Sequence, residues 1–497
     1  MAVKSISKSQ YMMGLQCVKR LWLYNYRKDL MPPIPPGQQL LFDQGTEVGE
    51  LAHKYFRNGK LVNYDHTQLP QAVEETKELI KNGTEVIYEG TFVFNNVLVR
   101  CDVLEKNKNG SWNLIEVKST TEVKDEHYPD TAIQKYVLEG SGLKINNVQL
   151  MHINNQYVKN GNIDPRGFFS LQDVTRKASE HQREIDKNLK EFMKVLLDDT
   201  NEAKIEIGKH CTYPYACEFQ PYCWKGIPAY SIYDIPRLSW EKINKLRSMG
   251  IIKIKDMPDN FTLSVNQRKY VKVEKSGQPY IEKTSISDFV KELEYPIYFI
   301  DFETISPAIP VYDGSRPYQQ IPFQLSLHIQ NAPNGELTHA GYLGDGKTDP
   351  RPGLAAFMVE KIGAKGSLVA YNAISFEAPR IKEMANDFPA FKDQLLGMAA
   401  RVKDLIQPFR QGAYVHPKFY GSYSIKNVLP ALCPGIPSYE AMPIANGGDA
   451  QIAYLKILSG KLSKEEVVKI RQDLDKYCSK DTESMVEILG QLYKTVK

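Results

Sequence analysis

Hydrophobic and polar residues follow two different periods along this chain, and together they predict a mixed α/β protein. Apolar residues dominate or alternate over 85–94, 97–106 and 112–119, which is typical of strands. Asn95-Asn96 and Asn109-Gly110 lie between these stretches, and such residues tolerate the positive φ angles of tight hairpin turns. The pattern therefore predicts a β-meander in the first part of the chain.

Apolar residues three and four positions apart predict helices on both sides of this meander. The predicted helices cover 10–26, 42–56, 130–142, 173–199 and, at the end of the chain, 463–496.

A chain of 497 residues is longer than a single hydrophobic core usually serves, so we expect several domains. An apolar strand over 296–303 opens a new strand-rich region. We predict a first domain over 1–228, a helical connector over 229–290 and a last domain over 291–497. In the connector, two short helices around Gly250 resemble a helix-hairpin-helix, whose backbone N–H groups can hold a phosphate; a plain helical linker is the alternative.

Composition narrows the possible surroundings and partners of the protein. Hydrophobic residues make up 42% of the chain and charged residues 25%, as in ordinary globular proteins. No apolar run approaches the roughly 20 residues of a membrane span, and the first residues lack the apolar core of a signal peptide. We therefore predict a cytoplasmic protein with reduced thiols and no membrane partner. The net charge of +4 is too small to identify a nucleic-acid partner, although a local basic groove is compatible with it.

The first candidate site lies on the predicted meander. Glu116 and Lys118 share one face of a strand, because Val117 between them takes the other face, and Asp102 lies on the preceding strand. Two carboxylates beside a lysine can hold a divalent metal ion and orient a water molecule. The alternative is an ordinary solvated strand face, on which the pattern Glu-x-Lys is common.

This set, with a histidine and a glutamine on the flanking helices, resembles the RecB-like branch of the PD-(D/E)XK nucleases, which includes the CRISPR-associated RecB-like exonucleases. The resemblance implies that His53, Asp102 and Glu116 bind Mg²⁺ or Mn²⁺. It also implies that Lys118 is catalytic and that Gln134 helps to position the site. The family often has Gln-x-x-x-Tyr, whereas a leucine stands four residues after Gln134 here.

The cysteines form a second pattern around the first domain. One of the seven precedes the meander, within Cys-x-x-Arg-Leu-Trp, and three follow it within a short stretch. This arrangement resembles the iron–sulfur nucleases of the RecB-like branch, and it implies a [4Fe–4S] cluster on Cys17, Cys211, Cys217 and Cys223. Zinc is the alternative, although the closely spaced cysteine pair typical of zinc sites is absent. We expect the other three cysteines to be small apolar core residues.

A strand that ends in acidic residues opens the last domain. The stretch "IYFIDFET" places Asp301 and Glu303 on the same side of an extended chain. Neighbouring carboxylates repel each other unless a cation lies between them, and a divalent metal ion is the usual solution. Two solvated carboxylates at a strand end are the alternative. Near the end of the chain, Tyr477 and Asp481 lie four residues apart and share one face of the predicted helix.

Asp-x-Glu, an Asn-rich acidic segment and Tyr-x-x-x-Asp, in this order, resemble the Tyr-bearing DEDD exonucleases of the RNase H-like fold. The resemblance implies that four carboxylates hold two Mg²⁺ ions and that Tyr477 orients or helps to deprotonate the attacking water. The family expects an aspartate in the second motif, where this chain has Glu377 one residue later, and Asp404 is the alternative ligand. The implied metal ligands are Asp301, Glu303, Glu377 and Asp481.

Together the two resemblances predict an α/β fusion nuclease similar to an uncharacterised bacterial or phage family. Its expected parts are a PD-(D/E)XK core with an iron–sulfur knot, a helical connector and an RNase H-like DEDD domain that trims 3′ ends. We expect a metal-dependent exonuclease with two active sites, acting in DNA repair, processing or phage defence. DNA is favoured because the iron–sulfur RecB-like nucleases act on DNA. The alternatives are one catalytic site beside a nucleic-acid-binding platform, an RNA-processing exonuclease, and a binding scaffold without catalysis.

Overall fold

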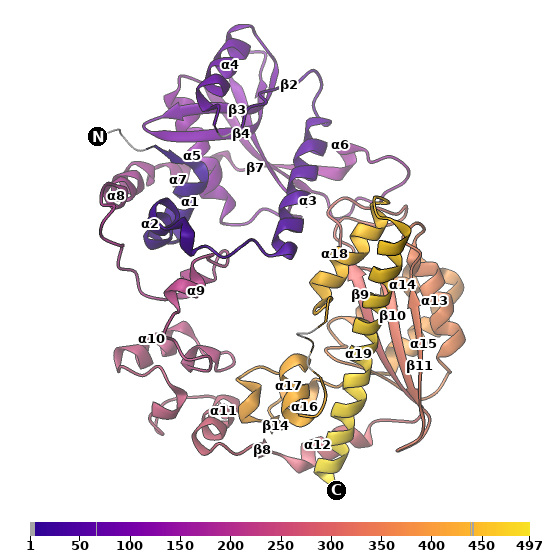
Figure 1. The fold of residues 1–497 in the computed structure, drawn as a ribbon. Coiled ribbons are helices and arrows are strands. Elements are labelled where there is room, and N and C mark those ends of the chain that lie inside the picture. The colour runs from indigo at the N-terminus through magenta and orange to yellow at the C-terminus, as the bar shows by residue number, and fades with distance from the viewer. Residues whose placement is uncertain (1–4, 66, 438, 440–441) are drawn as a thin grey trace. The chain divides into compact units, whose positions relative to one another are not determined.

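The computed structural model describes residues 5–65, 67–437, 439 and 442–497 (Figure 1). The chain forms two compact units, and each contains a mixed sheet with helices, which confirms the predicted α/β class. Unit 1 comprises residues 1–225 and 307–319, and unit 2 comprises residues 226–306 and 320–497.

Unit 1 is built on a seven-stranded sheet with the order β2-β3-β4-β5-β6-β7, and β1 pairs with β4 beside this path. The strands are β1 (Ile6–Ser7), β2 (Lys60–Leu61), β3 (Val86–Phe94), β4 (Val97–Lys106), β5 (Trp112–Lys118), β6 (Ile145–Ile153) and β7 (Phe169–Asp173). The α-helices are α1 (Lys8–Gln16), α2 (Val18–Tyr26), α3 (Pro36–His53), α4 (Leu69–Lys81), α5 (His127–Gly140), α6 (Pro165–Phe168), α7 (Thr175–Gln182), α8 (Ile185–Leu197) and α9 (Gln220–Cys223). Short 3₁₀ turns are η1 (Lys28–Leu30) and η2 (Lys209–Cys211).

The predicted β-meander is confirmed, and its turn residues explain it. Asn95 and Asn96 both have positive φ angles, 47° and 61°, directly between the paired ends of β3 and β4. Gly110, with φ 81°, serves the turn before β5. Asparagine and glycine accept left-handed backbone conformations at little cost, so the strands on either side pair in register.

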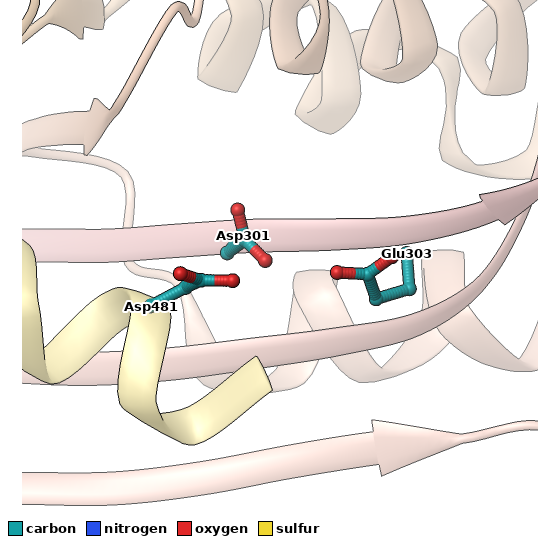
Figure 2. A group of neighbouring side chains, drawn as sticks. All are labelled: Asp301, Glu303 and Asp481. Atoms are coloured by element: carbon teal, nitrogen blue, oxygen red, sulfur yellow. The ribbon is translucent and has the colours of Figure 1, made fainter. Parts of the chain in front are cut away.

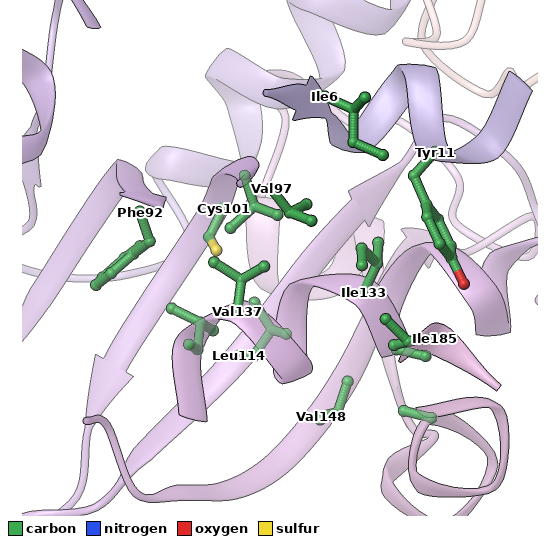
Figure 3. Close-up of a cluster of buried hydrophobic side chains, with 14 of the residues drawn as sticks. Ile6, Tyr11, Phe92, Val97, Cys101, Leu114, Ile133, Val137, Val148 and Ile185 are labelled. Atoms are coloured by element: carbon green, nitrogen blue, oxygen red, sulfur yellow. The ribbon is translucent and has the colours of Figure 1, made fainter. Parts of the chain in front are cut away.

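Helices cover both faces of this sheet because successive residues of β5 point to opposite sides. Leu114 belongs to a core that includes Ile133 and Val137 of α5, and Figure 3 shows these side chains together. Ile115, the next residue, belongs to a second core that includes Val48 of α3. Full burial of such side chains contributes about 1.5–3 kcal/mol each, which fixes α3 and α5 on the sheet.

Two predicted helices are each divided in two. The prediction over 10–26 was wrong at Cys17, whose extended backbone (φ −166°, ψ 119°) ends α1 and precedes α2. The prediction over 173–199 merged α7 and α8, since the helical spacing of buried residues in α8 begins only at Ile185. Charged residues continue across these breaks as they would along the solvated face of one helix, which is why the sequence pattern did not reveal them.

Unit 2 contains a five-stranded sheet with the order β11-β10-β9-β12-β13. β9 (Ile297–Ile305), β10 (Ile321–Gln330) and β11 (Leu337–Leu343) are antiparallel, and β12 (Ser367–Ala370) and β13 (Val402–Asp404) continue the sheet in parallel with β9. A separate pair consists of β8 (Tyr280–Ile281) and β14 (Tyr414–Val415). The α-helices are α10 (Trp240–Ser248), α11 (Val265–Ser276), α12 (Lys283–Lys291), α13 (Pro350–Lys361), α14 (Glu377–Asp387), α15 (Lys392–Ala400), α16 (Gln407–Arg410), α17 (Ile425–Leu432), α18 (Gly447–Leu458) and α19 (Lys464–Val496). Short 3₁₀ turns are η3 (Ile232–Asp234), η4 (Ile254–Asp256), η5 (Pro389–Phe391) and η6 (Pro417–Phe419).

The alternation of β9 answers why a buried strand carries two acids. Tyr298, Ile300 and Phe302 belong to the core beneath α13, α14 and α15. Asp301 and Glu303 therefore point to the opposite face of the sheet, where α19 packs against β9 and β10. The predicted helix over 463–496 is confirmed as α19, and a capping box at its first turn fixes where it begins. None of the described helices combines the length and apolar character that crossing a bilayer requires.

Candidate metal centre

Three carboxylates of unit 2 meet between β9 and α19 (Figure 2). Asp301 and Glu303 come from β9, Asp481 comes from α19, and the carboxylate of Glu303 is turned toward the other two. One oxygen of each lies within 4.8 Å of the others, close enough for all three to bind one divalent cation. The structure thus brings together three of the four predicted ligands of this domain.

These carboxylates are largely withdrawn from water, with Glu303 6% and Asp481 7% exposed. Burial raises the pKa of Asp301 and Glu303 well above the usual range, and the charge of Asp481 adds to this effect. Burial also raises the pKa of Asp481 to about 6, although hydrogen bonds from Tyr439 and Tyr477 oppose it. A bound divalent cation would reverse these shifts, because it favours the ionised carboxylates.

Glu377, the fourth predicted ligand, begins α14 and is only 2% exposed. Its Oε2 atom has no hydrogen-bond partner among the residues that the structure describes, and burial raises the pKa of this carboxyl to about 8. A buried carboxylate oxygen without a partner is costly, and a cation is the partner that would remove this cost. Asp404, the alternative ligand, instead accepts the backbone N–H groups of Ile374 and Ile406 at 3.4 and 3.3 Å.

The four acidic side chains line one pocket of about 350 Å³, called here the carboxylate pocket. The residues that define it are Asp301, Glu303, Glu377, Asp481, Tyr477, Tyr371 and Asn372. Asp404 does not line this pocket, so the geometry favours Glu377 over Asp404 as the fourth ligand.

Two buried tyrosines hold the carboxylate of Asp481. Tyr477 lies one helical turn before Asp481, and both Tyr477 and Tyr439 form hydrogen bonds with its side chain. Burial raises the pKa of both phenols, so they remain protonated, and the hydroxyl of Tyr439 also donates to Oγ of Ser484 at 3.0 Å. Sequence reasoning missed Tyr439, because it lies far from α19 in the chain and no spacing links the two.

In unit 1, the predicted metal ligand Glu116 is 2% exposed. Its Oε1 atom accepts hydrogen bonds from Lys118 and Lys8 at 2.7 and 2.8 Å, and its Oε2 atom accepts one from Gln134 at 2.7 Å. Lys118 also pairs with Asp130 at 2.5 Å. Sequence reasoning missed Lys8 and Asp130. The position of Asp130, one helical turn before Gln134, could have indicated it, whereas Lys8 had no local signal.

Asp102 lies next to this network. Its Oδ2 atom accepts the N–H of Val117 at 2.7 Å, and burial, followed by the charge of Glu116, raises its pKa to about 8. A pocket of about 500 Å³ is lined by Asp102, Lys118 and His53, among others. The ring of His53 stacks on Tyr88 at 4.2 Å, and burial lowers its pKa, so its nitrogens are available as neutral ligands at pH 7.

The four cysteines of the predicted iron–sulfur site line one pocket of unit 1. Cys17 lies at the break between α1 and α2, Cys211 ends η2, Cys223 ends α9, and the N–H of Cys217 donates to the carbonyl of Cys211 at 2.9 Å. Burial raises the pKa of the Cys17 and Cys223 thiols, and that of Cys217 to about 12. These thiols are therefore protonated when no metal is bound, and any metal has to displace their protons.

Comparison with known proteins finds relatives without an assigned activity. Residues 298–424 match a family model described as "Domain of unknown function (DUF2779)". The chain is 27% identical over 287 residues to "Uncharacterized protein UU173" of Ureaplasma parvum. This alignment covers 53% of this chain and 41% of that protein. It is 24% identical over 343 residues to "Uncharacterized protein MG366 homolog" of Mycoplasma pneumoniae. This alignment covers 59% of this chain and 50% of that protein. The matched region spans half or less of the length of these relatives.

Two solved structures are distantly similar. One, described as the crystal structure of SSO0001, has 13% identity and a TM-score of 0.17, and covers 37% of this chain and 96% of that chain. The other is the family B DNA polymerase of the archaeon Pyrobaculum calidifontis, with 10% identity and a TM-score of 0.24, covering 79% of this chain and 43% of that chain. At such TM-scores neither structure supports an argument about this protein.

Proposed function

We propose that this chain is a metal-dependent nuclease whose unit 2 is an RNase H-like exonuclease of the DEDD class, acting from the 3′ end. The observation that carries the proposal is the convergence of four carboxylates in one pocket. Three of them are buried, and one oxygen of Glu377 has no hydrogen-bond partner among the described residues. Burying mutually repelling acids is unfavourable, and Mg²⁺ or Mn²⁺ would compensate for it. Such ions supply activation of the attacking water and stabilisation of the leaving oxygen in phosphodiester hydrolysis.

The protein's own groups have separate roles in this proposal. Asp301, Glu303, Glu377 and Asp481 would hold the ions in the carboxylate pocket. Tyr477 remains protonated and donates to Asp481, so its role is to orient this carboxylate and the attacking water, and it does not act as a base. The polarity from the 3′ end comes from the resemblance to the DEDD class.

We propose a second hydrolytic site in unit 1, of the RecB-like PD-(D/E)XK type, with His53, Asp102 and Glu116 as metal ligands. Lys118 and Gln134 already contact Glu116, as the resemblance requires of a catalytic lysine and a positioning glutamine. Lys8 also contacts Glu116, so a metal ion that binds there has to compete with two ammonium groups.

We also propose that the four cysteines of unit 1 hold an iron–sulfur cluster. The supporting observation is that thiols from the two ends of this domain, Cys17 and the stretch 211–223, line the same pocket. DNA is the proposed substrate, because the resemblance in unit 1 is to nucleases that act on DNA.

The test is hydrolysis of DNA and RNA strands labelled at either end, single- and double-stranded, with Mg²⁺ or Mn²⁺. We expect stepwise loss of nucleotides from the 3′ end of DNA, which EDTA and the substitution Asp301→Asn both abolish. Asp345→Asn is the matched control, since this exposed carboxylate accepts the backbone N–H groups of Lys347 and Thr348 outside the carboxylate pocket. Tight binding of nucleic acid without cleavage in either metal would establish a scaffold and contradict the proposal.

A further inference from the structure

A second pocket of unit 2 adjoins the carboxylate pocket. Its volume is about 580 Å³, within the range of ligand-binding pockets. Tyr371 and Asn372 line both pockets, so the two are direct neighbours. The second pocket has the opposite electrostatic character, because its described lining includes Arg237 and Arg410 but no acidic side chain. We call it the arginine pocket, defined by Arg237, Arg410, Tyr371, Asn372 and Tyr423.

Arg410 is held in place before any ligand binds. Its Nη2 group donates to Oδ1 of Asn372, and its guanidinium lies 5.9 Å from the ring centre of Tyr423. The hydroxyl of Tyr371 donates to the backbone oxygen of Tyr423 at 2.7 Å, which fixes the segment that carries this ring. The result is a planar cationic surface beside an aromatic ring, and little side-chain entropy remains to be lost on binding.

Arg237 comes from the segment that we predicted to be a connector, and the structure places it in unit 2. The side-chain amide of Gln267, in α11, donates to the backbone oxygens of Pro236 and Arg237 at 3.3 and 3.0 Å. This contact holds a backbone turn in which Arg237 has a φ of 57°. The side chain itself is exposed, so it is free to bind an anion in the pocket.

We propose that the arginine pocket binds the nucleotides next to the 3′-terminal one, in an unpaired strand whose end lies in the carboxylate pocket. Guanidinium groups recognise phosphate oxygens with paired hydrogen bonds, and an arginine stacked on tyrosine offers a flat surface to a base. A base can stack there only when it is unpaired, which favours a single strand over a duplex. The inference rests on the proposed function of the carboxylate centre, and it makes the connector part of the substrate-binding surface.

The test measures fluorescence anisotropy of a 5′-fluorescein-labelled ten-nucleotide thymidine strand, with Ca²⁺ in place of Mg²⁺ to suppress cleavage. We expect Arg237→Gln and Arg410→Gln each to raise Kd about tenfold, as loss of a charged hydrogen bond implies. The dependence of log Kd on log salt concentration should become shallower by about 0.7 for each lost phosphate contact. Lys272→Gln is the matched control, because it removes one exposed positive charge of the same segment outside the arginine pocket.

The Lys118→Ala protein, in which the proposed unit 1 site is inactive, is tested separately on the p-nitrophenyl ester of thymidine 5′-monophosphate, so that hydrolysis of this single nucleotide reports on the carboxylate centre alone. If this ester and the strand are both left uncleaved in Mg²⁺ and Mn²⁺, the proposed function fails. If the ester is cleaved but neither arginine substitution changes Kd beyond the Lys272→Gln control, the inference alone fails. Equal affinity for a blunt duplex overturns the assignment to a single strand. Arg410→Lys, which keeps the charge, and melting temperatures of all variants separate lost binding from lost folding.

Discussion

At the scale of single residues, the hydroxyl of Tyr477 has a narrowly defined role. It donates to Asp481 and does not ionise at neutral pH, because burial raises its pKa. We expect Tyr477→Phe to leave Mn²⁺ affinity nearly unchanged and to lower kcat by roughly 10²-fold, because an orienting contact is lost, whereas Asp481→Ala abolishes both. Isothermal titration with Mn²⁺ and single-turnover kinetics measure the two quantities. A Tyr477→Phe protein as active as the wild type contradicts a role in orienting the water.

The raised carboxyl pKa values predict how stability depends on pH in the metal-free protein. Glu377 has a folded pKa of about 8, far above its unfolded value, so the folded state binds more protons than the unfolded state between these values. Its contribution to stability is therefore complete below the unfolded pKa and is lost as the pH rises through about 8. Mg²⁺ should restore stability at pH 8, because it binds the ionised form.

We accordingly expect Glu377→Gln to raise the Tm of the metal-free protein by about 2–4 °C at pH 8, and to have little effect at pH 5. Differential scanning fluorimetry in EDTA measures this shift. Glu336→Gln, at an exposed position before β11, is the matched control and should not change Tm at either pH. A Tm gain that is the same at pH 5 and pH 8 means that the carboxyl does not titrate in this range.

At the scale of elements, the arginine pocket depends on how the loop before α17 meets η3. Gly421 has a φ of 75°, and a Cβ atom at this position would overlap the backbone oxygen of Asp234. We expect Gly421→Ala to destabilise unit 2 by roughly 2 kcal/mol or more and to weaken strand binding. Gly435→Ala is the matched control, because no described atom lies within 4 Å of a Cβ there. Denaturant unfolding of the two variants tests the difference.

Sequence patterns predicted those helices, strands and turns that residues close together in the chain determine. The Asn95-Asn96 turn, the two-residue alternation of β9 and the helical spacing of apolar residues in α19 each depend on residues close in the chain, and each was recognisable. The break between α1 and α2 at Cys17 could not be recognised from the sequence, because no glycine or proline stands at this position. Sequence patterns also did not indicate Lys8, Tyr439 or Arg410. Their partners lie far away in the sequence, and only folding brings each residue next to its partner.

At the scale of the whole molecule, the two proposed active sites share no side chains. The set around Glu116 lies in unit 1, and the set around Asp301 lies in unit 2. We expect Lys118→Ala to remove one cleavage pattern and Asp301→Ala to remove trimming from the 3′ end, with only the double variant inactive. Product ladders from strands labelled at each end measure this. If either single substitution eliminates all cleavage, one unit is catalytic and the other serves as a binding platform.

The cysteine pocket predicts a metal content for the whole chain. We expect anaerobically purified protein to be brown and to contain iron, and Cys217→Ser to lose both the colour and the iron and to destabilise unit 1. Cys433→Ser is the matched control, since this buried cysteine lies in unit 2. Elemental analysis decides the outcome, and about one zinc per chain without iron would identify the alternative site.

The route of the chain between β9 and β10 limits how the protein can be dissected. Residues 307–319 leave unit 2, contribute Ala308 to a core of unit 1, and pair Asp313 with Lys159 before the chain returns to β10. A fragment that begins at Gly226 would keep every residue of the carboxylate pocket. It would expose residues 307–319, however, because the unit 1 residues that they pack against would be missing. Replacing 307–319 by a short turn between β9 and β10 should yield a soluble exonuclease fragment, whereas simple truncation should yield one that aggregates.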